Sequence, residues 1–374
     1  MVFSIFSHVQ HGEDEQGYFA YAPYVNEMNI WLQFVTEVRI VAPTSERKKE
    51  NIDGYYKHKN LKFLPISSFS FTNFVNGVNA IFAIPKIMLL FFIEMKKADH
   101  IHLRCPGNIG LLACIVQIFF PKKAKTIKYA GNWDPKSKQP LSYKLQKAIL
   151  SSTFLTKNAK VLVYGSWPDQ SKNIVPFFTA TYSNKEIEFH QPKYFVSPFR
   201  FIFVGTLSKG KNISYAIQLI EKLNDNGFSS VLNIYGEGKE YENLLHHINH
   251  SYWKKVIHMQ GNVNREDMKK VYKTSHFLIL ASKSEGWPKV VAEAMFWGCL
   301  PIATPVSCVS DMLHNGERGI ILSENLESDI EAISNLCKNG KYYNIISKKA
   351  LAWSQHYTTD LFEDEVIKLL KVLS

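Results

Sequence analysis

The chain has 374 residues, of which 46% are hydrophobic and 21% charged, and its formal net charge is +11. This length exceeds the roughly 50 to 250 residues of one domain, so we expect two domains. The composition is that of a soluble globular protein, and the first residues lack the pattern of a secretory signal peptide. The five cysteines form no C-x-x-C pair, which argues against a disulfide framework or a zinc site and suits a reducing compartment.

Short apolar runs in the first half predict strands, with helices between several of them. The predicted strands are Val2–Val9, Val38–Pro43, Leu61–Ile66, His100–Arg104, Lys125–Gly131 and Lys160–Ser166. The longest apolar stretch, Ala80–Ile93, contains Pro85 and Lys86 and is shorter than the roughly 20 residues of a spanning helix. We therefore expect a buried or interface-facing helix there, not a membrane span.

Strands and helices alternate in the second half. Strands are expected at Phe199–Thr206, Val231–Gly236, Val256–Gly261 and Phe277–Ala281, and helices at Ile213–Asn224, Lys239–Ile248 and Arg265–Ser275. This alternation is typical of a parallel sheet that is covered on both faces, a Rossmann-like domain. The first half follows the same logic, so the predicted class is α/β with two such domains. A linker rich in Asn, Lys, Pro and Ser is expected near residues 181–198.

Two glutamates, Glu285 and Glu293, lie on either side of a predicted helix start. The preceding strand ends at Ala281, so the segment before Pro288 is a loop at the carboxyl end of a parallel strand, where such sheets bind ligands. Proline suits the first helical position, and Gly298 suits the helix exit. Backbone N–H groups at this helix start form an anion site, to which we assign Gly286, Trp287, Pro288, Lys289 and Val290.

The run EGWPKVVAEA resembles the E-x7-E motif of retaining glycosyltransferases with the GT-B fold, in the large GT4-type family called glycosyl transferases group 1. VGTLSKGKN, YGEGKEYENL and QGNV are similar to other segments of this family. Residues 198–310 match in order and spacing. The resemblance implies two Rossmann-like domains whose parallel sheets face each other across a cleft. Residues 1–180 would bind the acceptor, residues 181–350 would bind a nucleotide sugar, and a C-terminal helix in residues 351–374 would cross back to the first domain.

The resemblance also implies roles in donor binding. Glu285 and the backbone after it would hold the donor sugar and phosphate, Lys211 would contact the diphosphate, and Glu293 would hold the ribose hydroxyls. Gly205 would let the backbone approach the diphosphate. The base pocket would be lined by Gly236, Gly238 and Val263. The chain departs from the family at Thr206, where an arginine is common, and Lys209 is the proposed substitute.

The acceptor side matches the family more loosely. His8–Met28 resembles the glycine-bearing loop after the first strand and the helix behind it, and His102–Gly110 places an arginine at a strand end near a helix start. Tyr129–Asp134 occupies the place where many relatives have a histidine. The candidates are His11, Gly12, Gly17, Arg104 and Asn132. Which residue faces the reacting centre stays open, and His8 and His11 have an alternative as ordinary loop histidines.

The implied reaction transfers a sugar from a nucleotide-diphosphate sugar to a glycan or lipid-linked acceptor with retention of configuration, in surface polysaccharide or glycoconjugate synthesis. No cofactor and no metal are expected, because Lys211 and the helix N-terminus would neutralise the leaving group, and the acidic runs Glu13–Glu15 and Glu363–Glu365 suit solvated surface. Two alternatives remain: a nucleotide-sugar epimerase of the same fold, and a non-catalytic binder of nucleotide sugars or anionic polymers. Nucleic acid is not an expected partner, since no nucleic-acid fingerprint accompanies the basic charge.

Positive charge is concentrated in the first half. Residues 1–180 contain 22 Lys and Arg against 12 Asp and Glu, a net charge of +10, whereas residues 181–374 contain 22 and 21, a net charge of +1. A basic half attracts an anionic surface, so we expect a cytoplasmic protein with peripheral contact at the inner face of the membrane. The alternative is a basic face that is only solvated.

Overall fold

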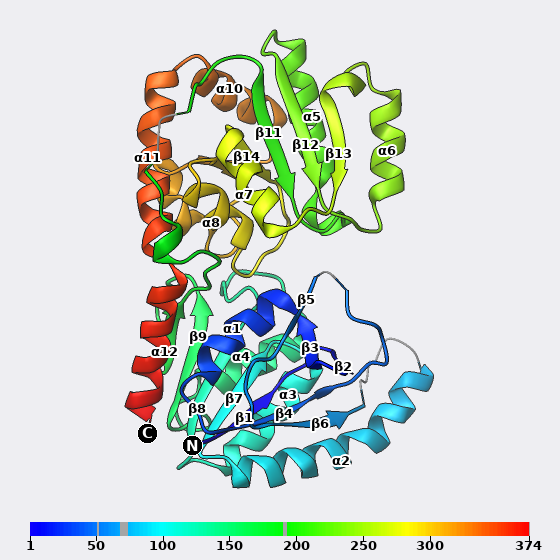
Figure 1. Cartoon of the computed structure of the whole chain (residues 1–374), viewed down its shortest axis with the longest axis vertical. Helices are drawn as coiled ribbons and strands as arrows, with labels where there is room; N and C mark the ends of the chain where they lie inside the picture. The colour runs from blue at the N-terminus through cyan, green and yellow to red at the C-terminus, as the bar shows by residue number, and fades with distance from the viewer. Residues whose placement is uncertain (51, 68–73, 190–192, 374) are drawn as a thin grey trace. The chain divides into compact units, whose positions relative to one another are not determined.

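The computed structural model describes residues 1–50, 52–67, 74–189 and 193–373. The chain divides into an N-terminal unit, Met1–Phe178 with Phe362–Ser374, and a C-terminal unit, Thr179–Leu361 (Figure 1). Each unit is built on its own parallel sheet. In the described part of the chain, no helix combines the length and the apolar character that a membrane crossing needs.

The N-terminal unit has a parallel sheet in the order β10-β9-β8-β7-β1-β4-β6. All six predicted strands are present, but β10 escaped prediction because it is a four-residue edge strand that contains a proline. The strands are β1 (Val2–Phe6), β4 (Glu37–Pro43), β6 (Leu61–Ile66), β7 (His100–Cys105), β8 (Ala124–Tyr129), β9 (Ala159–Tyr164) and β10 (Ile174–Phe177). The helices are α1 (Ala22–Leu32), α2 (Phe74–Lys97), α3 (Asn108–Val116) and α4 (Leu141–Ser151).

The segment after β1 differs from the predicted glycine-bearing loop. It forms a hairpin of β2 (His11–Asp14) and β3 (Gly17–Tyr21), which pairs with β5 (Asp53–Tyr55) in a small antiparallel sheet. The hairpin turns at Asp14–Gly17, where Gly17 has a φ of +120°. The glycines in this segment therefore serve a hairpin, and α1 follows it directly.

The apolar stretch Ala80–Ile93 lies within α2, whose side chains are described from residue 83 onward. One face of this part of the helix is buried in the core through Ile87, Phe91 and Met95. The opposite face carries Leu89 and Phe92, which are exposed. The expectation of a buried helix is therefore correct for one face only.

The C-terminal unit has a parallel sheet in the order β13-β12-β11-β14-β15-β16. The predicted strands and helices of this half are present, with ends that shift by about two residues or fewer. The strands are β11 (Phe199–Val204), β12 (Ser230–Tyr235), β13 (Ile257–Gly261), β14 (Phe277–Leu280), β15 (Leu300–Ala303) and β16 (Ile320–Ile321). The helices are α5 (Ile213–Asp225), α6 (Tyr241–His250), α7 (Arg265–Thr274), α8 (Lys289–Phe296), α9 (Val309–Met312), α10 (Leu326–Cys337) and α11 (Gly340–His356).

The described residues of the predicted linker, 181–189 and 193–198, belong to the C-terminal unit and pack on it. Tyr182 is buried between the rings of Phe296 and Trp297. Lys193 donates to the carbonyl groups of Tyr272 and Ser275 at the end of α7. The polar composition that suggested a linker reflects side chains that bond to neighbouring backbone, so this segment is structured.

The C-terminal segment begins later than the predicted residue 351, which lies inside α11. Helix α11 packs on α8, and α12 (Thr359–Leu373) follows it after a short break. In the N-terminal unit Phe362 packs on Phe177 and Phe178, with ring centroids 5.4 and 5.9 Å away. The apolar stripe of α12 continues with the buried residues Val366, Leu369 and Leu370.

Candidate functional site

Glu285 and Lys211 meet at the carboxyl edge of the C-terminal sheet. Lys211 ends a 3-10 turn, Lys209–Lys211, after β11, and Glu285 lies in the loop after the adjacent strand β14. The Nζ atom of Lys211 donates to Oε1 of Glu285 at 2.5 Å, and the side chains are 26% and 10% exposed. Two residues that the sequence assigned to one site are thus in direct contact, with part of the lysine open to solvent.

The loop that carries Glu285 is anchored by hydrogen bonds from three directions. The N–H of Lys283 donates to the carbonyl of Gly210 at 2.9 Å, which ties the loop to the lysine turn. The hydroxyl of Thr304 donates to the carbonyl of Ser282 at 2.6 Å. The hydroxyl of Ser307 donates to the carbonyl of Gly286 at 2.8 Å. The carboxylate is therefore presented by a fixed backbone.

Helix α8 begins one residue later than predicted, with Pro288 at the N-cap and Lys289 and Val290 in the first turn. Proline tolerates this position because it has no N–H group to satisfy. Gly298 has a φ of +66°, the left-handed conformation of the predicted helix exit. The ring of Trp287 packs on that of Trp353 in α11, with centroids 6.3 Å apart, and this contact ties the loop before α8 to α11.

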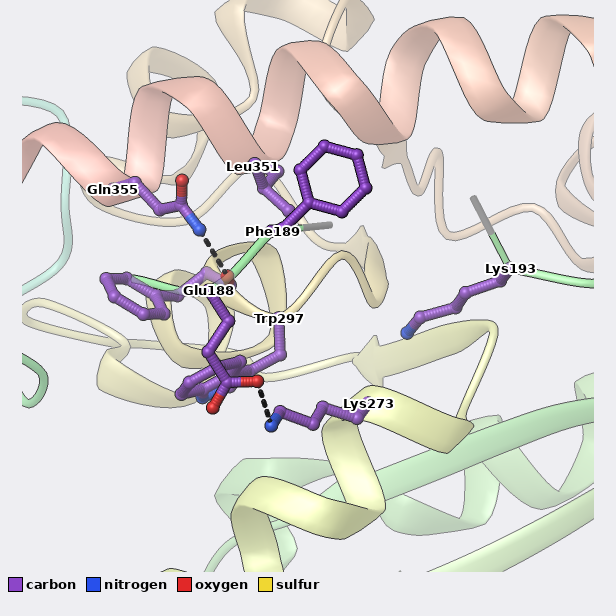
Figure 2. A pocket seen from close by; sticks show the side chains of 8 residues that line it. Glu188, Phe189, Lys193, Lys273, Trp297, Leu351 and Gln355 are labelled. Atoms are coloured by element: carbon purple, nitrogen blue, oxygen red, sulfur yellow. Dashed lines mark hydrogen bonds and ion pairs between the residues drawn. The ribbon is translucent and has the colours of Figure 1, made fainter. Parts of the chain in front are cut away.

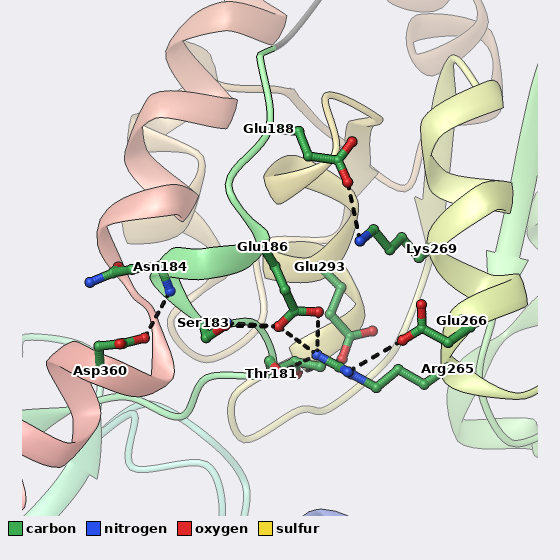
Figure 3. Close-up of polar contacts among 10 residues, drawn as sticks. All are labelled: Thr181, Ser183, Asn184, Glu186, Glu188, Arg265, Glu266, Lys269, Glu293 and Asp360. Carbon is green, nitrogen blue, oxygen red and sulfur yellow. Dashed lines mark hydrogen bonds and ion pairs between the residues drawn. The ribbon is translucent and has the colours of Figure 1, made fainter.

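Both carboxylate oxygens of Glu293 accept hydrogen bonds. Oε1 accepts from the hydroxyl of Thr181 at 2.7 Å, and Oε2 accepts from the hydroxyl of Tyr272 at 3.0 Å. Arg265 donates to the carbonyl of Thr181 at 3.1 Å and to the carboxylate of Glu186, which holds the threonine in place (Figure 3). Burial and the charge of Glu293 raise the pKa of Tyr272, so its hydroxyl stays a donor. Sequence reasoning missed these partners, because they lie on the supposed linker and on α7.

The glycines at the strand ends bring three loops into backbone contact. The N–H of Gly205 donates to the carbonyl of Tyr235 at 3.0 Å, and the N–H of Gly236 donates to that of Gly261 at 2.9 Å. A Cβ atom on Gly236 would lie 2.0 Å from the carbonyl oxygen of Gly205, and one on Gly238 would lie 2.3 Å from that of Leu207. These glycines are explained by close loop packing. Exposed residues beside the packed loops are Thr206, Lys209 and Val263.

The carboxyl edge of the N-terminal sheet also has a cavity, of about 300 Å³. Its lining comes from the loops after β1 and β7, the last residue of β4, the start of α3 and α4, namely His8, Gln10, Pro43, Pro106, Gly107, Asn108, Ile109 and Tyr143. Partial burial of the ring and the positive charge of Arg104 lower the pKa of His8, so the imidazole is neutral at pH 7. His8 was not among the candidates, although its place after the first strand was a usable signal.

Four of the five predicted acceptor-side residues contact or crowd against other groups of the N-terminal unit. His11 is fully buried, contacts the carbonyl of Val9 and the hydroxyl of Tyr56 at 2.8 Å each, and has a pKa lowered to about 4 by burial. A Cβ atom on Gly12 would lie 2.3 Å from the ring of Phe19. The guanidinium of Arg104 is 3.4 Å from Glu27, and Oδ1 of Asn132 accepts from the N–H of Asp134. The fifth, Gly17, lies in the hairpin.

Another cavity, of about 190 Å³, lies in the C-terminal unit and is lined by residues of the segment before β11 and of α7, α8 and α11 (Figure 2). Trp297 forms one wall, and the ammonium groups of Lys269 and Lys273 lie 4.6 and 4.7 Å from its ring. Both lysines pair with Glu188. The one carboxylate, Glu188, thus faces two lysines, and the third lysine at the cavity, Lys193, donates to backbone carbonyl groups. Within the described ranges, no three His, Cys, Asp or Glu side chains group as a set of metal ligands.

Residues 184–353 match the family described as Glycosyl transferases group 1. The predicted resemblance to this family is confirmed. The matched segment covers the C-terminal sheet, helices α5 to α10, most of α11 and both glutamates of the motif. Two curated relatives are glycosyltransferases described as uncharacterized. The relative from Haemophilus influenzae is 28% identical over 43% of this chain and 46% of its own length, and that from Methanocaldococcus jannaschii is 25% identical over 51% and 52%. The chain thus spans about half the length of the curated relatives it matches.

Solved structures of glycosyltransferases have the same fold at low sequence identity. Sucrose-phosphate synthase from Thermosynechococcus elongatus aligns with a TM-score of 0.69 at 14% identity, over 100% of this chain and 99% of that chain. Anabaena Alr3699/HepE in complex with UDP aligns with a TM-score of 0.67 at 11% identity, over 99% of each chain. WaaG, a glycosyltransferase involved in lipopolysaccharide biosynthesis, aligns with a TM-score of 0.62 at 12% identity, over 95% of each chain. The chain therefore has the GT-B fold, as predicted.

Proposed function

We propose that the chain is a glycosyltransferase that moves a sugar from a nucleotide-diphosphate sugar to a glycan or lipid-linked acceptor, with retention of configuration. The observation that carries the proposal is the contact of Lys211 with Glu285 beside the start of α8, at the carboxyl edge of a parallel sheet. A diphosphate placed there would meet an ammonium group and a helix N-terminus together. The match to the group 1 family over residues 184–353 supports the same site.

The mechanism follows from charge separation in the bond that breaks. Cleavage between the anomeric carbon and the diphosphate places negative charge on the leaving group and positive charge on the sugar. Lys211 and the N–H groups at the start of α8 would stabilise the leaving group. When the diphosphate of the donor replaces Glu285 as the partner of Lys211, the Glu285 carboxylate would be able to accept hydrogen bonds from sugar hydroxyls. Glu293 would do the same for the ribose.

We propose that the reaction needs no divalent cation, because a lysine and a helix N-terminus supply the neutralising charge. A chelator should then leave the rate unchanged, and a loss of activity that added Mg²⁺ or Mn²⁺ restores would contradict this.

The N-terminal cavity with His8 would receive the acceptor. We also propose a cytoplasmic protein of surface polysaccharide or glycoconjugate synthesis, a role that the likeness to WaaG supports.

A panel of nucleotide sugars and acceptors tests the activity. A transferase should release nucleoside diphosphate and form a glycosylated acceptor in equal amounts. An epimerase would convert the sugar nucleotide without any acceptor, and a binding protein would shift in melting temperature with the nucleotide but release nothing. Either of these outcomes would overturn the proposal.

A further inference from the structure

The exposed face of α2 is apolar in its middle and basic at both ends. Leu89, Phe92 and Ile93 are 61%, 42% and 39% exposed, and the exposed lysines Lys86 and Lys96 flank them. Residues 86, 89, 93 and 96 follow helical spacing, so they form one stripe. We call these five residues the α2 face.

A neighbouring turn extends the α2 face. Phe119, in the 3-10 turn after α3, is 66% exposed, and its ring centroid is 6.4 Å from that of Phe92. Lys97, next along the helix, forms an ion pair with the buried Glu94 at 2.8 Å, so we do not count it in the α2 face. Four large apolar side chains therefore lie exposed within one area of the N-terminal unit.

We propose that the α2 face docks on an anionic lipid bilayer, with the apolar side chains at the boundary of headgroups and acyl chains and Lys86 and Lys96 on lipid phosphates. A helix that presents apolar side chains between lysines has the pattern of interfacial membrane binding. The charge favours lipid as the occupant, because the net charge of +10 in residues 1–180 attracts the whole half to an anionic leaflet. This surface is independent of the proposed function.

The chain offers a matched control on α11. There Tyr342 and Ile345, each 49% exposed, lie between the exposed residues Lys341 and Lys348, so apolar side chains again lie between two lysines. The α11 surface has two apolar side chains instead of three, and nearby Lys349 pairs with Glu317 at 3.0 Å. It also belongs to the half whose net charge is only +1. We expect it to contribute nothing to lipid binding.

Co-sedimentation of the full chain with vesicles tests the proposal. The wild type should pellet with vesicles of phosphatidylcholine and phosphatidylglycerol at low salt, and should detach from them at high salt. Leu89→Glu/Ile93→Glu should abolish pelleting. Lys86→Glu/Lys96→Glu should weaken it at least 25-fold, since each surface lysine contributes about fivefold. Ile345→Glu should pellet as the wild type does. Circular dichroism verifies the fold of each variant, whose changed side chains are exposed.

Three outcomes would overturn the proposal. A wild type that stays in the supernatant with anionic vesicles has no such surface. If the wild type pellets equally with vesicles of phosphatidylcholine alone, binding does not depend on anionic lipid and the lysines have no role in it. Release by Ile345→Glu but not by the α2 variants moves the contact to α11. None of these outcomes involves sugar transfer, so the failure of this proposal is distinct from failure of the proposed function.

Discussion

At the carboxyl edge of its sheet the C-terminal unit has an ion pair, Lys211 with Glu285, whereas the same edge of the N-terminal unit has a cavity beside a neutral imidazole, His8. Both edges arise from the same architecture, because parallel strands end together and their loops converge. The difference lies in which loop residues carry charge. An ion pair suits a diphosphate, and a cavity lined without Asp, Glu, Lys or Arg suits hydroxyls, so the difference supports the proposed placement of donor and acceptor in different units.

The largest expected effect concerns the charged edge. Lys211→Ala should lower kcat by about 10² to 10³, since it removes a preorganised charge from the leaving group. Steady-state kinetics with the donor found by the panel measures this. Lys222→Ala is the control, because Lys222 lies in the last turn of α5, is exposed and pairs with Asp225, and this change should leave kcat nearly unaltered. If the two variants are equally active, the diphosphate does not bind at the ion pair.

A second difference between the units is the number of buried neutral histidines. Burial lowers the pKa of His11 and His100 in the N-terminal unit to about 4, and burial with Arg200 lowers that of His276 in the C-terminal unit to about 4. Burial also holds the pKa of His102, in the N-terminal unit, well below its usual value. The unfolded chain binds protons below about pH 6.5 and the folded chain does not, so stability falls as the pH drops from 6.5 towards 4.

At pH 5.5 each such histidine costs roughly 1.4 kcal/mol of the free energy of unfolding. Among the described residues the N-terminal unit has three and the C-terminal unit one, so the N-terminal unit should destabilise more. Hydrogen exchange of peptides from each unit, at pH 7 and 5.5 with intrinsic rates corrected, measures this. Equal losses in both units would contradict the assignment of neutral rings.

The next prediction concerns Glu293, the proposed ribose ligand in the C-terminal unit. Glu293→Gln should raise the donor KM about ten- to a hundredfold, since a charge-assisted hydrogen bond contributes about 1.5 to 3 kcal/mol. Tyr272→Phe, which removes one hydroxyl donor to that carboxylate and keeps the ring, should raise it less. A donor KM in Glu293→Gln equal to that of the wild type would leave the carboxylate as a purely structural acceptor for Thr181 and Tyr272.

The smallest expected effect concerns the uncharged edge. His8→Ala should raise the acceptor KM about two- to tenfold, the loss of one neutral hydrogen bond, and leave the donor KM unchanged. Because burial and the charge of Arg104 lower the pKa of His8, the acceptor KM of the wild type should change at a lower pH than the pH near 6.5 at which an ordinary histidine is half protonated. His247→Ala, an exposed histidine of α6, is the control. If His8→Ala raises the donor KM and leaves the acceptor KM unchanged, His8 contacts the donor and the proposed acceptor role is wrong.

Most of the fold was readable from the sequence, because buried parallel strands are continuous apolar runs and helices separate them. The place of Glu285 in a loop at the carboxyl end of a strand followed from the same pattern, whereas the role of Lys211 was implied by the family resemblance and its contact with Glu285 was not predicted. Partners far apart in the chain were not predictable. Thr181 and Tyr272 reach Glu293 only because residues 181–189 fold onto α7 and α8, and no local pattern encodes that packing.

The hairpin after β1 shows a different limit. Gly12 and Gly17 were compatible with a ligand-binding loop or with a turn, and the choice depended on the distant partner strand β5. That pairing buried His11 and left His8 at the cavity. A one-letter pattern does not distinguish the two histidines, since both lie within four residues of each other after the same strand.

The return of the chain at Phe362 to the N-terminal unit has a consequence for biosynthesis. A ribosome delivers Phe177 and Phe178 long before the ring that covers them, so the first unit to emerge is also the last to be completed. The C-terminal unit is one continuous segment and has all its parts while residues 362 onward are still in the tunnel. Premature termination after Leu361 would therefore yield a finished second unit attached to a first unit with an uncovered aromatic patch, a substrate for chaperones.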